Sequence, residues 1–228
     1  MMMGSPRCTR FKLLVLFVVV FASTLLASLG IASDQPSTAP ARLTYTKLLQ
    51  GSTPEYLAVT VATNGEATFE GRKADDPSAP QSFRLSESTT RRVFQLAEAL
   101  GYFQSVDLES HRKVANLGLK TFIYEADGKR NQAQFNYTLL RDAQDLADLF
   151  ERVASVELYI LTLEHAIKYD HLSLPDTLRQ IQIDLGKRDL ADPELMAPTL
   201  EKIASNPRFL HLAQSRAQQI LQRLQNHD

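Results

Sequence analysis

The sequence predicts an α+β protein: a small antiparallel β-hairpin sheet with one packed helix, followed by a long helix and a C-terminal helical subdomain. Three observations lead to this prediction. Alternating side chains flank an Asn-Gly pair and, later, an Asp-Gly pair, as in β-hairpins. One stretch of helical period lies between the two hairpins, and helical period dominates from about residue 142. The composition is globular, with 44% hydrophobic and 22% charged residues.

The first 32 residues differ from the rest and read as a signal peptide or a signal anchor. Three cations between Arg7 and Lys12 precede an uncharged, mostly apolar run at residues 13–33. The run is long enough for an uncleaved transmembrane helix, while Gly30-Ile31-Ala32 offers small residues at both positions needed for cleavage before Ser33. In either case the bulk of the chain is expected to be extracytoplasmic, either periplasmic or secreted.

Cysteine and charge exclude several classes of function. The only cysteine, Cys8, precedes the apolar run, so the exported part has no disulfide and no thiolate metal site. The whole chain has a formal net charge of −1, and removing the three leader cations lowers it to −4. Nucleic-acid binding is therefore not expected, because it needs a basic surface.

A Pro/Ser/Thr/Ala linker at 33–42 precedes a strand-rich α+β domain at 43–138. Its first strand is expected at Leu43–Leu49. The stretch Pro54–Arg72 predicts a hairpin whose larger aliphatic side chains share one buried face. Its Asn64-Gly65 pair predicts a type I′ turn, in which both residues have positive φ.

A polar loop at Lys73–Pro80 and a short strand at Ser82–Leu85 follow the hairpin. Apolar residues then recur at helical spacing from Ser86 to Leu100, and Gly101 stands where a left-handed C-cap is needed. The apolar face of this helix is expected to lie on the sheet.

The second half of the strand domain begins with an unpatterned segment. Residues 104–118 have no clear period, so the sequence does not predict whether this segment is ordered or disordered. A second hairpin then runs to Tyr137, with Asp127-Gly128 at its turn. The predicted order is strands, helix, strands.

Residues 139–228 predict a long helix and a helical hairpin subdomain. Seven apolar residues from Leu146 to Ile167 recur at spacings that alternate between three and four. This seam could form a homodimer through the 146–167 helix, but Phe150 and Leu158 widen the apolar face, which favours packing within one chain.

Prolines divide the remaining chain into shorter helices. Pro175 lies near one start, and Asp192-Pro193 and Asn206-Pro207 each match an N-cap followed by proline at the first helical position. The inward-facing residues are expected to be Leu195, Met196, Leu200 and Ile203, and then Leu210, Ala213, Ala217, Ile220 and Leu224.

No catalytic, cofactor-binding or metal-ligating residue is predicted. The motifs of serine hydrolases, zinc proteases, phosphate loops and dinucleotide sites are absent. His165 and His171 are six residues apart, whereas ligands on one helical face need a spacing near four. His111, in the unpatterned segment, is the least constrained candidate for function, and a plain surface position is the simpler interpretation.

The first hairpin resembles a known family. Pro-Glu-Tyr at 54–56, followed by Val-Thr-Val and Asn-Gly-Glu-Ala-Thr-Phe-Glu-Gly, is similar to a family of uncharacterised extracytoplasmic bacterial domains. In that family a Pro-x-Tyr strand pairs through a glycine turn with a strand ending in Tyr or Phe-x-Gly. The resemblance covers about residues 43–137, although relatives often carry a cysteine where this chain has Thr53. It implies no known activity, and the C-terminal helices resemble a HEAT-type pair.

These observations favour a non-catalytic interaction or scaffolding module at the cell envelope, with an unidentified envelope protein as its partner. The exposed edges of the hairpins could accept a partner strand, and the membrane is contacted only if the N-terminal segment stays uncleaved. One alternative is an envelope hydrolase with a cleft between the strand domain and the helices. Another is a secreted inhibitor that presents a loop such as Lys73–Pro80.

Overall fold

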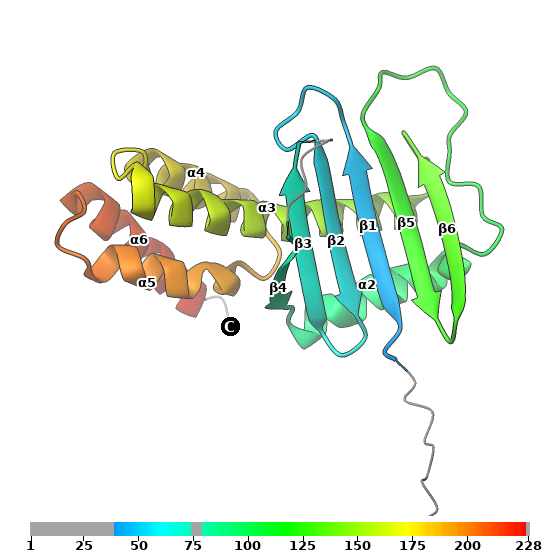
Figure 1. Cartoon of the computed structure of the whole chain (residues 1–228), viewed down its shortest axis with the longest axis horizontal. Coiled ribbons are helices and arrows are strands. Elements are labelled where there is room, and N and C mark those ends of the chain that lie inside the picture. Colours follow the sequence, from blue (N-terminus) through cyan, green and yellow to red (C-terminus); the bar gives the residue numbers. More distant parts are fainter. Residues whose placement is uncertain (1–38, 74–78, 227–228) are drawn as a thin grey trace, which may run out of the picture. The chain divides into compact units, whose positions relative to one another are not determined.

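The computed structural model describes residues 39–73 and 79–226. The predicted leader, most of the linker and the middle of the Lys73–Pro80 loop lie outside the described residues. Within these two ranges no helix combines the length and the apolar character needed to cross a bilayer. The described chain has an α+β fold in which all strands belong to one antiparallel sheet (Figure 1).

The sheet has six strands in the order β4-β3-β2-β1-β5-β6. The two predicted hairpins, β2–β3 and β5–β6, join through β1, which pairs with β2 on one side and β5 on the other. The strands are β1 (Arg42–Leu48), β2 (Tyr56–Ala62), β3 (Glu66–Arg72), β4 (Gln81–Arg84), β5 (Leu119–Ala126) and β6 (Lys129–Phe135).

The helices occur where the sequence placed them, one between the two hairpins and the others after β6. Pro193 begins a short 3-10 helix rather than an α-helix, and another 3-10 turn follows α2. The helices are α2 (Glu87–Ala99), η1 (Gly101–Phe103), α3 (Arg141–Tyr169), α4 (Leu174–Lys187), η2 (Pro193–Met196), α5 (Ala197–Ser205) and α6 (His211–Gln225).

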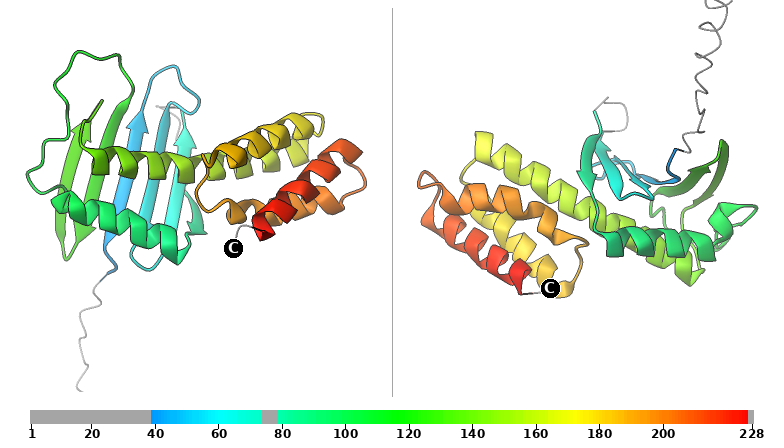
Figure 2. Two further views of the ribbon diagram at one scale, coloured as in Figure 1. Left: turned by 180° about the vertical axis from the view of Figure 1, so that it is seen from behind. Right: turned by 90° about the horizontal axis from the view of Figure 1, so that it is seen from below.

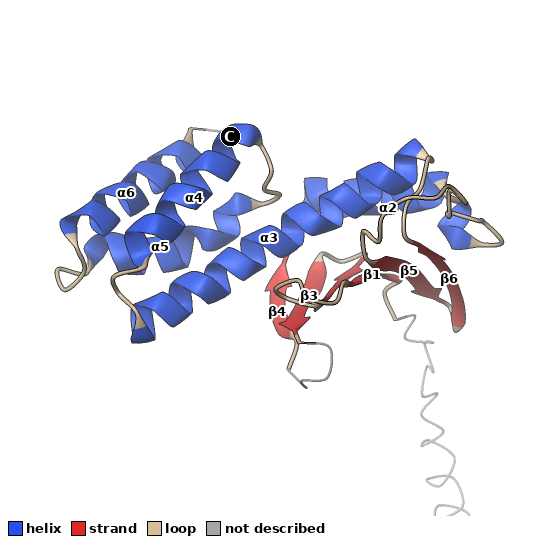
Figure 3. Ribbon diagram, turned by 90° about the horizontal axis from the view of Figure 1, so that it is seen from above, coloured by secondary structure: helices blue, strands red, loops and turns tan. Residues whose placement is uncertain are grey.

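One face of the sheet is covered by two helices. The sequence assigned only α2 to this face, but the N-terminal half of α3 also packs there (Figure 2). Tyr45 of β1 stacks on Phe150 of α3 with ring centroids 5.3 Å apart, and it lies 5.5 Å from Phe122 of β5. Within the described residues no helix lies on the opposite face of the sheet, and the sheet curves toward this open face (Figure 3).

The C-terminal half of α3 forms a second core with α4, α5 and α6. Four of the seven seam residues of α3 are buried within the chain, and the other three are partly buried. The broad apolar face of this helix therefore packs largely on the rest of its own chain, as its width predicted. The buried seam residues are Leu146, Val153, Val156 and Leu163.

Two local predictions need correction. Only Gly65 of the Asn64-Gly65 pair has positive φ (83°), and Ala62 accepts a hydrogen bond from the Gly65 N–H. The loop therefore has three residues, a turn followed by a left-handed glycine, instead of a two-residue type I′ turn. The Asp127-Gly128 turn is of the predicted kind, since φ is 50° and 71° at its two residues.

The start of the last helix also differs from the prediction. Asn206 follows the last residue of α5, and α6 begins only at His211. The Asn206 side chain accepts a hydrogen bond from the Arg208 N–H, which closes a turn of the connecting loop instead of capping a helix. Leu210 consequently lies outside the helix and is 48% exposed, whereas the other predicted inward residues of α6 are buried.

Candidate binding edge of the sheet

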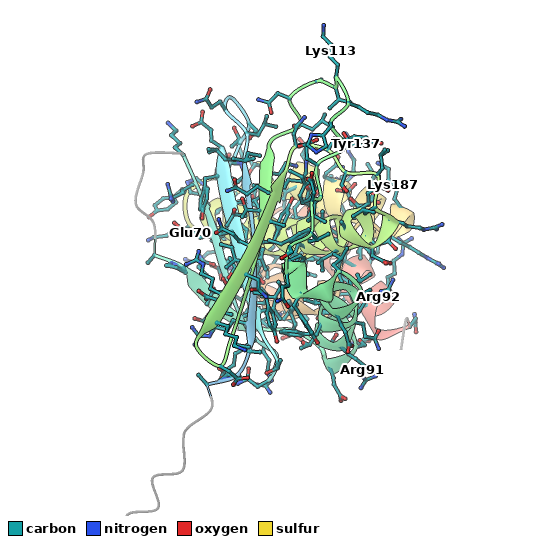
Figure 4. The ribbon with its side chains drawn as sticks, turned by 90° about the vertical axis from the view of Figure 1, so that its right-hand side faces the viewer. Glu70, Arg91, Arg92, Lys113, Tyr137 and Lys187 are labelled. Atoms are coloured by element: carbon teal, nitrogen blue, oxygen red, sulfur yellow. The ribbon has the colours of Figure 1, made fainter. Side chains whose placement is uncertain are left out.

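The two edges of the sheet are unequal. The β4 edge has four residues, and short edge strands give a partner strand little to pair with. The β6 edge has seven residues, Lys129–Phe135, with no proline among them. Among residues 39–73 and 79–226, β6 pairs only with β5. Its outer side is therefore the longer open edge, and it faces the viewer in Figure 4.

The type I′ turn determines which backbone groups of β6 point outward. In such a turn the flanking residues, Ala126 and Lys129, form a hydrogen-bonded pair, and every second pair along the ladder does the same. The backbone groups of the alternate residues, Arg130, Gln132 and Gln134, thus point away from β5. The outer edge offers three N–H and three C=O groups in a row.

Side chains on the inner face hold β6 in place. Ala133 and Phe135 are buried, and Phe135 lies 5.4 Å from Phe122 between ring centroids. Asn131 donates a hydrogen bond from Nδ2 to the carbonyl oxygen of Tyr102, 3.1 Å away. The side chains of Gln132 and Gln134 lie on the open face of the sheet and are exposed. The strand β6 is thus anchored through its inner face, while its open face is accessible.

The unpatterned segment 104–118 folds against the C-terminal end of β6. Ser110 donates its N–H to the Tyr137 carbonyl at 2.8 Å, and Glu109 accepts the Asn136 N–H at 2.6 Å. This hydrogen bond lowers the pKa of the Glu109 carboxyl. The Asn136 side chain also bonds to the backbone of Ala115 and Leu117. These contacts join the middle and the C-terminal part of the segment to residues 136 and 137. Figure 4 shows Tyr137 at the upper end of β6.

The three histidines considered in the sequence, His111, His165 and His171, are all exposed. His111 Nε2 lies 2.6 Å from Asp107 Oδ2, and this hydrogen bond raises the pKa of His111. However, the His111 side chain is 72% exposed, so the pair is not in a deep cleft. His165 is exposed beside Tyr169, and His171, which follows the end of α3, hydrogen-bonds through Nε2 to the carbonyl oxygen of Ile167 in α3. The described residues contain no group of three potential metal ligands.

A charged cluster between β1 and α3 was not predicted from the sequence. Glu151 of α3 accepts a hydrogen bond from the Tyr45 hydroxyl at 2.8 Å and from Lys47 Nζ at 3.0 Å to each of its oxygens. Burial, followed by the Glu151 charge, raises the pKa of Tyr45 far above its ordinary value. Lys47 and Glu151 also line a cavity of about 200 Å³. Glu151 accepts the hydrogen bonds of both other members of the cluster. It therefore ties β1 to α3, and no local sequence signal links residues so far apart.

A shallow groove separates the strand-rich part from the C-terminal helices, where the hydrolase alternative places its cleft. Asp192 lines this groove, but its carboxylate accepts hydrogen bonds from the Ser86 N–H, the Ser86 hydroxyl and the Thr89 hydroxyl at 2.6, 2.8 and 2.5 Å. The carboxylate thus caps the N-terminus of α2. Its three hydrogen bonds join the start of η2 to the start of α2.

Comparisons with known proteins add no assignment. No protein-family model matches the chain, and no curated protein matches it. The resemblance of residues 43–137 to an extracytoplasmic domain family therefore stays a prediction.

Proposed function

We propose that this chain is a non-catalytic interaction or scaffolding module of the cell envelope, which binds an envelope protein by accepting an extended segment along β6. The observation that supports the proposal is the open seven-residue edge, with its three outward backbone N–H and C=O pairs. The envelope location rests on the charged and apolar pattern of the first 32 residues.

The fixed inner face of β6 favours strand addition. Its buried Phe135 and the hydrogen bond of Asn131 keep the strand in place before a partner arrives. A preorganised edge loses little conformational entropy on binding, so more of the hydrogen-bond energy appears as affinity. The middle of β6 also lacks the inward charges and prolines with which many proteins block their edges.

The test is affinity purification of the tagged full chain from the envelope fraction, followed by mass spectrometry. Gln132→Pro removes the central outward N–H, while an edge strand tolerates proline at such a position. Gln132→Thr is the matched control because it changes the side chain and keeps the N–H. We expect Gln132→Pro to reduce recovery of the partner by about tenfold or more, with each tenfold being 1.4 kcal/mol, and Gln132→Thr to leave recovery unchanged.

Equal recovery with all three chains, each shown to be folded by circular dichroism, would contradict binding at β6. Loss of the partner with both variants would assign recognition to the Gln132 side chain instead of the backbone edge.

A further inference from the structure

We propose that the segment that pairs with β6 is β6 of a second copy of this chain, in antiparallel orientation with a two-fold axis through Gln132. The inference rests on the proposed function in using the same edge, and it adds the identity of the partner strand. The two sheets would form one sheet of twelve strands, six from each copy.

The outward backbone groups allow only one full register. With the axis at Gln132, residue 132 faces its own copy and Arg130 faces Gln134, so all three outward residues of each strand pair. An axis at Gln134 would pair Gln132 with Asn136, which is already bonded to the 109–117 segment. An axis at Arg130 would instead pair Gln132 with Gly128 in the turn.

The charges of β6 fit this register. Both cations, Lys129 and Arg130, lie at one end of the strand, and its middle is uncharged. Antiparallel pairing about Gln132 places each Arg130 opposite a Gln134 and each Lys129 opposite a Phe135. Like charges therefore do not face each other, whereas an axis at Arg130 would bring two guanidinium groups together. The two Gln132 side chains meet at the centre, where their amides can hydrogen-bond.

The curvature of the sheet bears on how the helices of two copies would lie. The helices lie on the convex face and the sheet bends toward its open face (Figure 3). Continuing this bend across β6 moves the helices of the two copies apart. The other route to a homodimer, through the 146–167 helix, is disfavoured because Val153, Val156 and Leu163 of that seam are buried in their own chain.

Disulfide trapping tests the proposal on the purified full chain in detergent, with Cys8→Ser as the background. Opposite residues of a hydrogen-bonded antiparallel pair have Cα atoms about 5.5 Å apart, within the range that a disulfide spans. We expect Gln132→Cys to form covalent dimers under a mild oxidant about tenfold faster than Gln81→Cys, because only its thiols are held in bonding geometry. Gln81 is the matched control, an exposed glutamine on the opposite edge strand.

The register has its own test. Arg130→Cys alone should not cross-link, since its two thiols would be separated by four residues along the strand, about 13 Å. Mixing Arg130→Cys chains with Gln134→Cys chains should give the heterodimer. Cross-linking of Arg130→Cys with itself would overturn the register, and equal rates for Gln132→Cys and Gln81→Cys would overturn the proposal.

Failure of this inference can be told from failure of the proposed function. If Gln132→Cys does not cross-link while Gln132→Pro still loses an envelope partner, β6 binds a different protein and the second-copy inference is wrong. If Gln132→Cys cross-links and Gln132→Pro does not reduce the recovery of any other protein, the second-copy inference holds and the binding of a different envelope protein at β6 is wrong.

Discussion

Replacement of Glu157 by glutamine should stabilise the protein at neutral and alkaline pH. Glu157 lies on α3 with only 3% of its surface exposed, and its Oε1 finds no hydrogen-bond partner among the described residues. Burial, followed by the negative charge of Glu164, raises the pKa of its carboxyl from 4.5 to about 7. The folded protein therefore holds this proton in a pH range where the unfolded chain has lost it.

The sign and size of the effect follow from proton linkage. A raised carboxyl pKa favours the folded state at low pH, and this contribution is lost as pH rises from 4.5 to about 7. Since one pKa unit corresponds to 1.36 kcal/mol, the full shift amounts to about 3 kcal/mol. A glutamine side chain cannot ionise, so Glu157→Gln should raise the free energy of unfolding by about 1–3 kcal/mol at pH 8 and change it little at pH 4.

Urea unfolding of the full chain, followed by circular dichroism between pH 4 and pH 9, measures this difference. Glu164→Gln is the control, because Glu164 is exposed and acts on Glu157 only through its charge. Glu164→Gln should raise the free energy of unfolding at pH 8 by less than Glu157→Gln does. The reasoning is refuted if the stability of the unmodified protein does not fall between pH 4.5 and pH 7, or if Glu157→Gln brings no gain at pH 8.

Two further substitutions test tertiary features. Asp192→Ala removes three hydrogen bonds to the N-terminus of α2 and should lower the free energy of unfolding by about 1–2 kcal/mol. The control Glu194→Ala should change it by less than about 0.5 kcal/mol. Urea titrations measure both values. Gly65→Ala should cost more than Gly128→Ala in thermal melts. Both glycines have positive φ, but a Cβ at Gly65 would lie 3.3 Å from the Leu85 carbonyl oxygen, while nothing lies within 4 Å at Gly128. Equal losses would contradict the steric argument.

Local patterns were enough to predict most elements. Side-chain alternation in β2 placed Val59 and Val61 on the buried face, and helical spacing placed Val93 and Leu96 of α2 in the core. Such periods appear in the sequence because neighbouring residues of one element share the same solvent boundary. The Asn64-Gly65 turn was mispredicted because two- and three-residue hairpin loops use similar residues, and pairing of the whole hairpin decides between them.

The candidate binding edge depended on information that no local pattern contains. The sequence by itself determined that a β5–β6 hairpin exists and that its turn is of type I′, because Asp127-Gly128 suits that turn. Only the tertiary structure decided that β1 pairs with both β2 and β5, which leaves β6 at the edge. Tertiary packing likewise brought Asp192 to the N-terminus of α2 and buried Glu157. Strand order and such contacts depend on the combined free energy of distant segments, whereas turns and periods depend on a few adjacent residues.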